Sequence, residues 1–222
     1  MAAKNRILLV EGNDDKHVLY SLTKAYDIPD CFEIRDRNSE GISGWKRIIE
    51  DLDVELDRSD LESLGILVDA DENPVGRWHS IRDRLLGLGY SDTPVNASSD
   101  GTIVVHENKP TVGIWLMPNN EDRGMLEDFL AALIPDYQGN RLWQHVTESV
   151  GAIPREEVRF PDARKSKVLI HTWLAWQNEP GKPFGQAITA NYLSARTAGS
   201  EALIQWLRRL FVDSPQSVPQ HI

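Results

Sequence analysis

The chain opens with a short apolar run followed by apolar residues at helical spacing. Residues 7–10 are four apolar residues bounded by polar ones, a pattern that predicts a strand buried on both faces. A helix is predicted directly afterwards from the spacing of Val18, Leu19, Leu22, Ala25 and Tyr26. Glu11 and Gly12 therefore lie at the turn between a strand and a helix.

The alternation of strand and helix continues up to about residue 134. A weak strand is predicted at residues 31–35 and a stronger one at residues 64–68. Two more strands are predicted at residues 102–107 and 111–117, and a hairpin at residues 108–110 would join them. Helices are predicted from three sets of apolar residues: Trp45, Ile48, Ile49, Leu52 and Leu56; Trp78, Ile81, Leu85 and Leu88, with Pro74 in the first turn; and Leu126, Phe129, Leu130, Leu133 and Ile134. Strands that alternate with helices favour a mainly parallel sheet with helices on both faces. We assign this α/β domain to residues 1–137.

Beyond residue 137 the pattern predicts helices without strands. One helix is indicated by Leu142, Val146 and Val150, a second by residues 165–176, and a third by the apolar residues of 203–211. Four of the seven tryptophans fall in this segment, which gives it enough apolar area to pack on the sheet. We therefore expect residues 138–213 to be a docked helical extension, and residues 214–222, with two prolines, to be a flexible tail.

Composition narrows the class of protein. Hydrophobic residues make up 41% and charged residues 26%, which is ordinary for a globular protein, and no apolar run approaches the ~20 residues of a membrane helix. The N-terminus lacks a signal-peptide core, so we expect a cytoplasmic protein without a membrane partner. A single cysteine, Cys31, excludes an internal disulfide and a cysteine-based zinc ribbon. With a net charge of −10, binding to a polyanion requires cations or a local basic patch.

Acidic residues follow two of the predicted strands. Glu11 ends the first, and Asp69 and Asp71 end the strand at 64–68. Ligands of open α/β sheets bind at this edge, and residues two apart on an extended strand point to the same side. A divalent cation would relieve the repulsion between such carboxylates, and an oxygen-only set with Asp15 in support suits Mg²⁺ or Mn²⁺. The competing interpretation is that acids cap helix N-termini, which is worth roughly 0.3–1 kcal/mol and explains Asp14 and Glu72 well.

These motifs carry a family resemblance. Val10-Glu11-Gly12-x-x-Asp15 followed by Val68-Asp69-Ala70-Asp71 resembles the Toprim signature shared by type IA and type II topoisomerases, bacterial primases, ribosomal-RNA maturases and OLD-type (overcoming lysogenization defect) nucleases. The resemblance covers about residues 5–134 and includes Gly124-x-x-Glu127-Asp128, which is similar to small bacterial Toprim-domain proteins related to the OLD group. It implies that Glu11 is a metal ligand or general acid/base, that Asp69 and Asp71 hold magnesium, and that Asp15 supports them.

The departures from the Toprim pattern narrow the activity. The chain has no Gly-x-x-x-x-Gly-Lys-Ser/Thr loop, so the ATPase domain of full OLD proteins is missing, and 222 residues leave little room for a topoisomerase gate. We expect a metal-dependent nuclease or phosphodiesterase that acts on DNA or RNA.

Further charged residues are candidates for a supporting role. Glu127 and Asp128 could reach the acidic cluster or could be ordinary first-turn acids of a helix, and these alternatives weigh equally. Lys165 and Lys167 could contact a scissile phosphate, as the resemblance to OLD-type nucleases suggests, although a solvated helix face is the simpler interpretation. Arg77, His79 and Arg82 could likewise guide a phosphate or simply serve solubility.

Two other functions compete with the nuclease. A receiver-like phosphoacceptor domain could begin with the same residues 8–15, but it needs a lone aspartate and a lysine after a late strand, where this chain has Leu116-Met117-Pro118-Asn119. A catalytically silent Toprim scaffold could serve a separate partner such as an ATPase. The acidic overall charge favours the scaffold, and the retained acids favour the enzyme.

Overall fold

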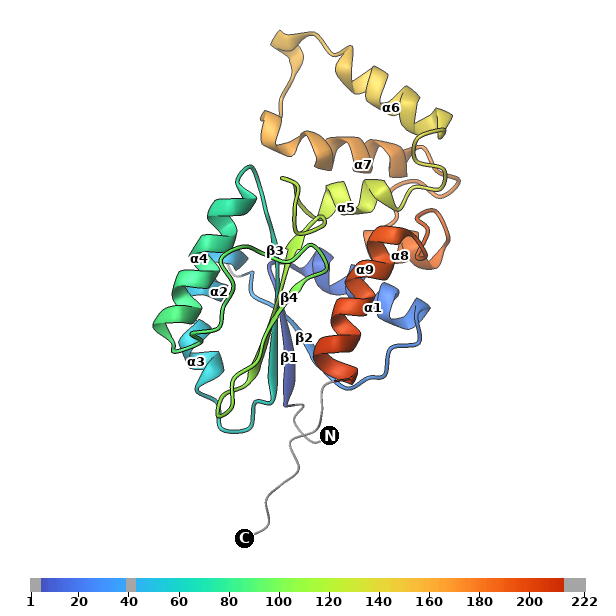
Figure 1. Ribbon diagram of the computed structural model, residues 1–222. Helices are drawn as coiled ribbons and strands as arrows, with labels where there is room; N and C mark the ends of the chain where they lie inside the picture. The colour runs from blue at the N-terminus through green and yellow to red at the C-terminus, as the bar shows by residue number, and fades with distance from the viewer. Residues whose placement is uncertain (1–4, 39–42, 214–222) are drawn as a thin grey trace.

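A five-stranded sheet forms the centre of the protein. The computed structural model describes residues 5–38 and 43–213. The strand order is β2-β1-β3-β5-β4, and all neighbours are parallel except the edge strand β4, which runs antiparallel to β5. The strands are β1 (Arg6–Val10), β2 (Glu33–Asp36), β3 (Ser63–Asp69), β4 (Thr102–Val104) and β5 (Thr111–Met117). The predicted α/β class, with a mainly parallel sheet and helices on both faces, is confirmed (Figure 1).

One face of the sheet is covered by three helices from the first half of the chain. They are α2 (Gly44–Glu50), α3 (Leu52–Leu56) and α4 (Pro74–Gly87), and they share a buried cluster with Ile7 and Leu9 of β1 (Figure 1). Pro74 occupies the first turn of α4, as predicted. The single helix predicted around residues 45–56 is two helices in the structure, because the chain turns at Asp51, which ends α2 and begins α3.

The opposite face joins helices from the two ends of the chain. Leu8 and Val10 pack in one buried cluster with α1 (Asn13–Ala25), α8 (Phe184–Thr189), α9 (Ala198–Leu207) and the π-helical turn η3 (Arg208–Val212). Phe211 of η3 stacks on Phe32 at 4.3 Å between ring centroids. Alternate residues of β1 thus serve two cores, as expected for a strand buried on both faces.

Three helices stand near the carboxyl edge of the sheet, at the top of Figure 1. They are α5 (Leu126–Ala132), α6 (Arg141–Gly151) and α7 (Lys165–Ala175), with the short 3-10 turns η1 (Arg155–Glu157) and η2 (Asp162–Arg164) before α7. Trp143 of α6 and Trp173 of α7 belong to the same buried cluster as the sheet residues. The extension predicted at residues 138–213 therefore contributes side chains to the core of the α/β domain, and the tail predicted at 214–222 lies outside the described residues.

Two glycines paired across β3 and β5 allow the C-terminal helix to lie directly on the sheet. Gly65 is the register partner of Gly113. A Cβ atom added to Gly113 would lie 2.4 Å from Leu210 Cδ2, and one added to Gly65 would lie 3.0 Å from Phe211 Cζ. The absence of side chains at both positions makes room for η3.

We expect Gly113→Ala to destabilise the fold because the new methyl group overlaps Leu210. Overpacking of this kind costs about 1–3 kcal/mol, which lowers the melting temperature of a protein of this size by roughly 2–4 °C for each kcal/mol. Thermal unfolding followed by circular dichroism measures the change. Gly151→Ala is the matched control, because a Cβ there meets nothing within 4 Å. Equal melting temperatures for the two variants would show that η3 can move away from the sheet.

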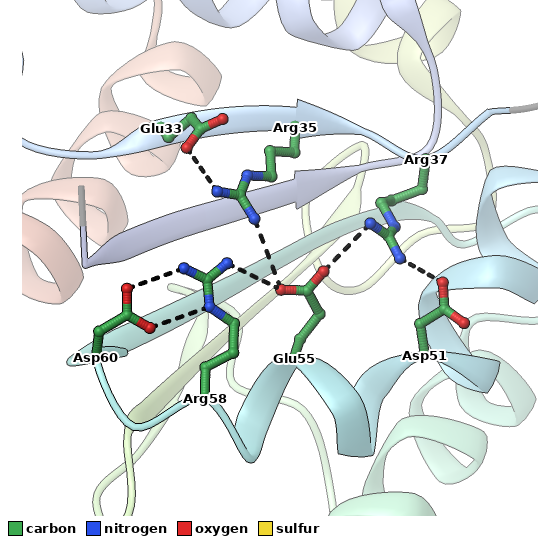
Figure 2. A network of polar contacts seen from close by, with 7 residues as sticks. All are labelled: Glu33, Arg35, Arg37, Asp51, Glu55, Arg58 and Asp60. Atoms are coloured by element: carbon green, nitrogen blue, oxygen red, sulfur yellow. Dashed lines mark hydrogen bonds and ion pairs between the residues drawn. The ribbon is translucent and has the colours of Figure 1, made fainter. Parts of the chain in front are cut away.

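A network of ion pairs attaches α3 to β2, the edge strand at the other side of the sheet from β4 (Figure 2). Glu55 of α3 is only 8% exposed, and its carboxylate lies 3.2 Å from Arg37, 3.8 Å from Arg35 and 3.8 Å from Arg58. The outer carboxylates of the network are Glu33, Asp51 and Asp60. Each of the three arginines has at least two carboxylate partners, so the network is a structural contact and not a free basic patch.

Candidate functional site

The strand order places a switch point between β1 and β3. From β1 the chain goes to β2 on one side and then crosses to β3 on the other. In open α/β sheets, ligands bind outside the carboxyl ends of the strands at such a switch point. Glu11 follows β1, and Asp69 is the last residue of β3. The two residues meet as predicted, since the Asp69 N–H donates to Glu11 Oε1 at 2.9 Å.

Glu11 is held from a second side by the start of α2. A Cβ atom at Gly44 would lie 2.0 Å from the Glu11 carbonyl oxygen, so only glycine permits this approach. The backbone N–H of Trp45 also donates to the Glu11 carboxylate. Burial raises the pKa of Glu11, while the Asp69 N–H and the nearby charge of Arg77 lower it, and the net direction is upward.

Asp15 and Asp69 lie beside Glu11. Asp15, in the first turn of α1, is 8% exposed and accepts the Gly12 N–H at 3.0 Å. Burial, followed by the charge of Glu11, raises the pKa of Asp15 to about 7. Asp69 accepts the Leu126 N–H at 2.9 Å. Burial raises the pKa of Asp69 well above its usual range, and the charges of Asp15, Glu11 and Glu127 add to the effect.

Helices α5 and α7 supply further charged groups. Glu127, which is 4% exposed, forms an ion pair with Lys167, and Lys167 Nζ lies 2.9 Å from Glu127 Oε1. Partial burial lowers the pKa of Lys167, but the bond to Glu127 and the charges of Asp14 and Asp69 outweigh it and raise the pKa overall. We call Glu11, Asp15, Asp69 and Glu127 the acidic cluster. Lys167 thus lies at this cluster and not on a purely solvated helix face.

Two other predicted supporting residues have different positions. Asp128 accepts the Met125 N–H at 2.9 Å and the Ser166 hydroxyl at 2.6 Å, so it caps α5 and joins it to α7. Lys165 is exposed at the start of α7. The structure therefore separates Glu127 and Lys167, which contribute to the acidic cluster, from Asp128, whose carboxylate has structural partners.

Asp71 departs from the prediction that it points to the same side as Asp69. That prediction required an extended backbone, but β3 ends at Asp69 and Asp71 has a left-handed φ of 52°. Its backbone N–H and carbonyl instead pair with Gly124, each at 2.8 Å. The Asp71 carboxylate is 53% exposed and forms an ion pair with Arg77. Aspartate tolerates the left-handed conformation better than most residues, which is why the turn forms here.

The donor set of the site fits magnesium or manganese, whereas the conformation is not a ready coordination shell. All donors are carboxylate oxygens. Burial, and after it the charges of the neighbouring acids, raises the pKa values of Asp15 and Asp69, and a dication would relieve the repulsion among these charges. Among residues 5–38 and 43–213, however, no group of three or more acidic, histidine or cysteine side chains is arranged to hold an ion. Asp71 could join Glu11 and Asp69 only after it leaves Arg77.

The contacts that Arg77, Trp45 and Ser166 make around the site are not among those predicted from the sequence. The Arg77 guanidinium lies over the Trp45 ring, 4.0 Å from its centroid. The signal in the sequence for the ion pair between Arg77 and Asp71 is the turn Asp71-Glu72-Asn73-Pro74, which brings the first turn of α4 back toward Asp71. Asn120, close to the same edge of the sheet, is a buried turn residue that accepts the Leu116 N–H at 2.8 Å.

Fold and site together define an α/β protein with a buried acidic cluster at the switch point of its sheet. The chain belongs to the family described as "Protein of unknown function (DUF3226)", whose model matches residues 5–212. No curated protein and no solved structure matches the chain. Within the described residues, every helix is too short or too polar to cross a membrane.

Proposed function

We propose that this protein is a Mg²⁺- or Mn²⁺-dependent nuclease or phosphodiesterase that acts on nucleic acid in the cytoplasm. The observation that carries the proposal is the meeting of Glu11 and Asp69 at the switch point, with Asp15 and Glu127 close enough for their charges to raise the pKa of Asp69. Carboxylates held together against their own repulsion are typical of a site that binds cations. The resemblance of residues 10–15 and 68–71 to the Toprim signature supports the same activity.

The residues of the site have separable roles in this mechanism. A bound dication would neutralise the charge that develops on the phosphate and lower the pKa of a water molecule. Glu11, fixed by the Asp69 and Trp45 amides, is the residue that would orient the attacking water and accept its proton. Asp69 and Asp15 supply the buried negative charge that would attract a cation, and Asp71 would join the residues that hold it if its carboxylate turned away from Arg77. Lys167 places a positive charge beside Glu127, where it can contact a phosphate oxygen.

The alternative is a catalytically silent scaffold that works with a separate partner such as an ATPase. The observation in its favour is that Asp71 is paired with Arg77 and no ready coordination shell exists among the described residues. A receiver-like function has less support, since β5 ends at Met117 and the next residues are Pro118 and Asn119 instead of a lysine. Metal uptake separates the enzyme from the scaffold.

We expect wild-type protein to bind Mn²⁺ and the Asp69→Asn, Asp71→Asn double variant to lose this binding. Both substitutions remove charge and keep an oxygen acceptor, so the bond from the Leu126 N–H to residue 69 persists. Isothermal titration calorimetry measures the uptake. The control is the Asp83→Asn, Asp92→Asn double variant, which makes the same charge change at exposed positions. Equal uptake by the site variant and wild type would refute the metal site.

A cleavage screen tests the activity directly. Purified protein is incubated with single-stranded, double-stranded and structured DNA and RNA, with Mn²⁺ or with a chelator. The proposed function requires metal-dependent products from at least one substrate class. Metal binding without cleavage of any substrate, even after a candidate ATPase is added, would favour the scaffold.

A further inference from the structure

An open hollow lies beside the acidic cluster, on the side of α4. Its volume is about 320 Å³, and its lining includes Trp45, Asp71, Asn73, Gly76 and Arg77. This volume is at the lower end of the range for ligand pockets, roughly 300–1,000 Å³. The hollow adjoins Asp71, so a ligand in it would touch the residue that the mechanism needs for metal binding.

Arg77 is the basic residue among the described residues that line the hollow. Its side chain is only 10% exposed, because the guanidinium is packed over the Trp45 ring at 4.0 Å while it pairs with Asp71. Arg77 also lowers the pKa of Glu11, so its charge acts on two of the four carboxylates of the Toprim-like motifs, Glu11 and Asp71. An arginine held on an aromatic ring keeps its planar group in place and needs little further ordering to bind an anion.

Metal binding and the Asp71–Arg77 ion pair compete for one carboxylate. If Asp71 turns toward a dication held by Glu11 and Asp69, Arg77 loses its partner, and the new positive charge at the cluster repels it. The Trp45 ring and helix α4 still hold the guanidinium at the wall of the hollow. It then presents a planar set of N–H donors that matches the oxygens of a phosphate.

We propose that Arg77 is a phosphate-binding residue and that its ion pair with Asp71 blocks it until a divalent cation binds the Asp71 carboxylate. The hollow would then accept a phosphate of the nucleic acid only after the metal is bound. The inference rests on the proposed function and adds an order of binding to it. It predicts that the protein binds nucleic acid weakly in the absence of metal, since Arg77 is then neutralised by Asp71.

The first test follows metal affinity. Arg77→Gln removes the competitor for Asp71, so we expect Mn²⁺ to bind about two- to fivefold more tightly, as expected for the loss of a partly exposed ion pair. Arg84→Gln is the matched control, because Arg84 lies on the same helix and pairs with Asp53 at 3.1 Å outside the hollow. Unchanged or weaker Mn²⁺ binding by Arg77→Gln would overturn the inference.

The second test follows binding of a cleavage-resistant phosphorothioate oligonucleotide by fluorescence anisotropy. Wild type should bind the oligonucleotide more tightly with Mn²⁺ than without it. Arg77→Gln should lose this gain, and the slope of its log binding constant against log salt concentration should be smaller by about one, the change expected for one lost phosphate contact. Asp71→Asn frees Arg77 without metal, so it should bind the oligonucleotide several-fold more tightly than wild type in chelator. Asp92→Asn, with the same charge change at an exposed site, should match wild type.

The outcomes separate this inference from the proposed function. If wild type binds Mn²⁺ and cleaves nucleic acid, but Asp71→Asn and Arg77→Gln bind the oligonucleotide as wild type does, Arg77 has no role in phosphate binding and the enzyme proposal stands. If wild type takes up no Mn²⁺, both fail. Melting curves for each variant show whether it is folded, and Asp71→Asn keeps the test decisive if Arg77→Gln does not fold.

Discussion

We expect Glu11→Gln to lose the proposed metal-dependent phosphodiester cleavage by at least about 100-fold and to keep its fold, because general-base and metal roles are each worth at least this factor. The glutamine oxygen can still accept the N–H groups of Asp69 and Trp45, so the contacts that position residue 11 remain. What disappears is the negative charge and the ability to take a proton from water. The expected loss is therefore in turnover and not in structure.

The measurement is the initial rate of cleavage of the best substrate with Mn²⁺, together with a melting curve. Contaminating nucleases are the main hazard, so wild type, Glu11→Gln and the control Asp92→Asn are purified in parallel. Asp92 is exposed and loses the same charge when substituted. Equal manganese-dependent rates for wild type and Glu11→Gln would show that the activity does not come from this site.

The second large effect concerns Asp15, whose replacement by asparagine should stabilise the metal-free protein at neutral and higher pH. Its pKa is about 7 in the fold against a usual value of 3.8. Between these two values the folded state binds more protons than the unfolded state, so this residue makes stability fall as pH rises. Above pH 7 Asp15 is charged and buried beside Glu11. We expect Asp15→Asn to gain at least about 1 kcal/mol at pH 8, or roughly 2–4 °C in melting temperature.

Differential scanning calorimetry in chelator at pH 4 and pH 8 distinguishes this effect from a general change in stability. The gain from Asp15→Asn should be present at pH 8 and small at pH 4, where the wild-type carboxyl is protonated in the fold. Asp14→Asn is the control, since Asp14 is the exposed neighbour in the same helical turn. Added Mg²⁺ should stabilise wild type more than Asp15→Asn. A variant that is less stable than wild type at pH 8 would mean that Asp15 has a structural role.

The pattern of apolar residues predicted most of the sheet and the centre of the site. β1, β3 and β5 are strongly apolar runs, and their bounds differ from the predicted ones by no more than a residue. Glu11 and Asp69 could be placed together because strands that are parallel end at the same edge. Lys167 was harder to place, since its contact with Glu127 depends on how α7 packs on α5.

The remaining errors come from backbone turns that side-chain periodicity does not record. Asp71 lies two residues after Asp69, so in a continued strand both carboxylates would point to the same side. Its backbone pairing with Gly124 and its left-handed φ instead turn the Asp71 carboxylate toward Arg77. The helix predicted around residues 45–56 has continuous apolar spacing, and only the turn at Asp51 divides it. The position of η3 on Gly65 and Gly113 could not be predicted either, because it joins residues far apart in the chain.

The placement of η3 against the paired glycines has a consequence for the order in which the protein forms during translation. The sheet is complete once β5 has left the ribosome, but its glycine-lined face is covered by residues at the far end of the chain. At about 5–20 residues per second, the ribosome needs several more seconds to deliver that cover. Throughout this interval α1 can already cover the part of this face over β1 and β2, whereas the glycine-lined part over β3 and β5 is open to water, which would make the nascent chain a natural client for chaperones that bind at the ribosome exit.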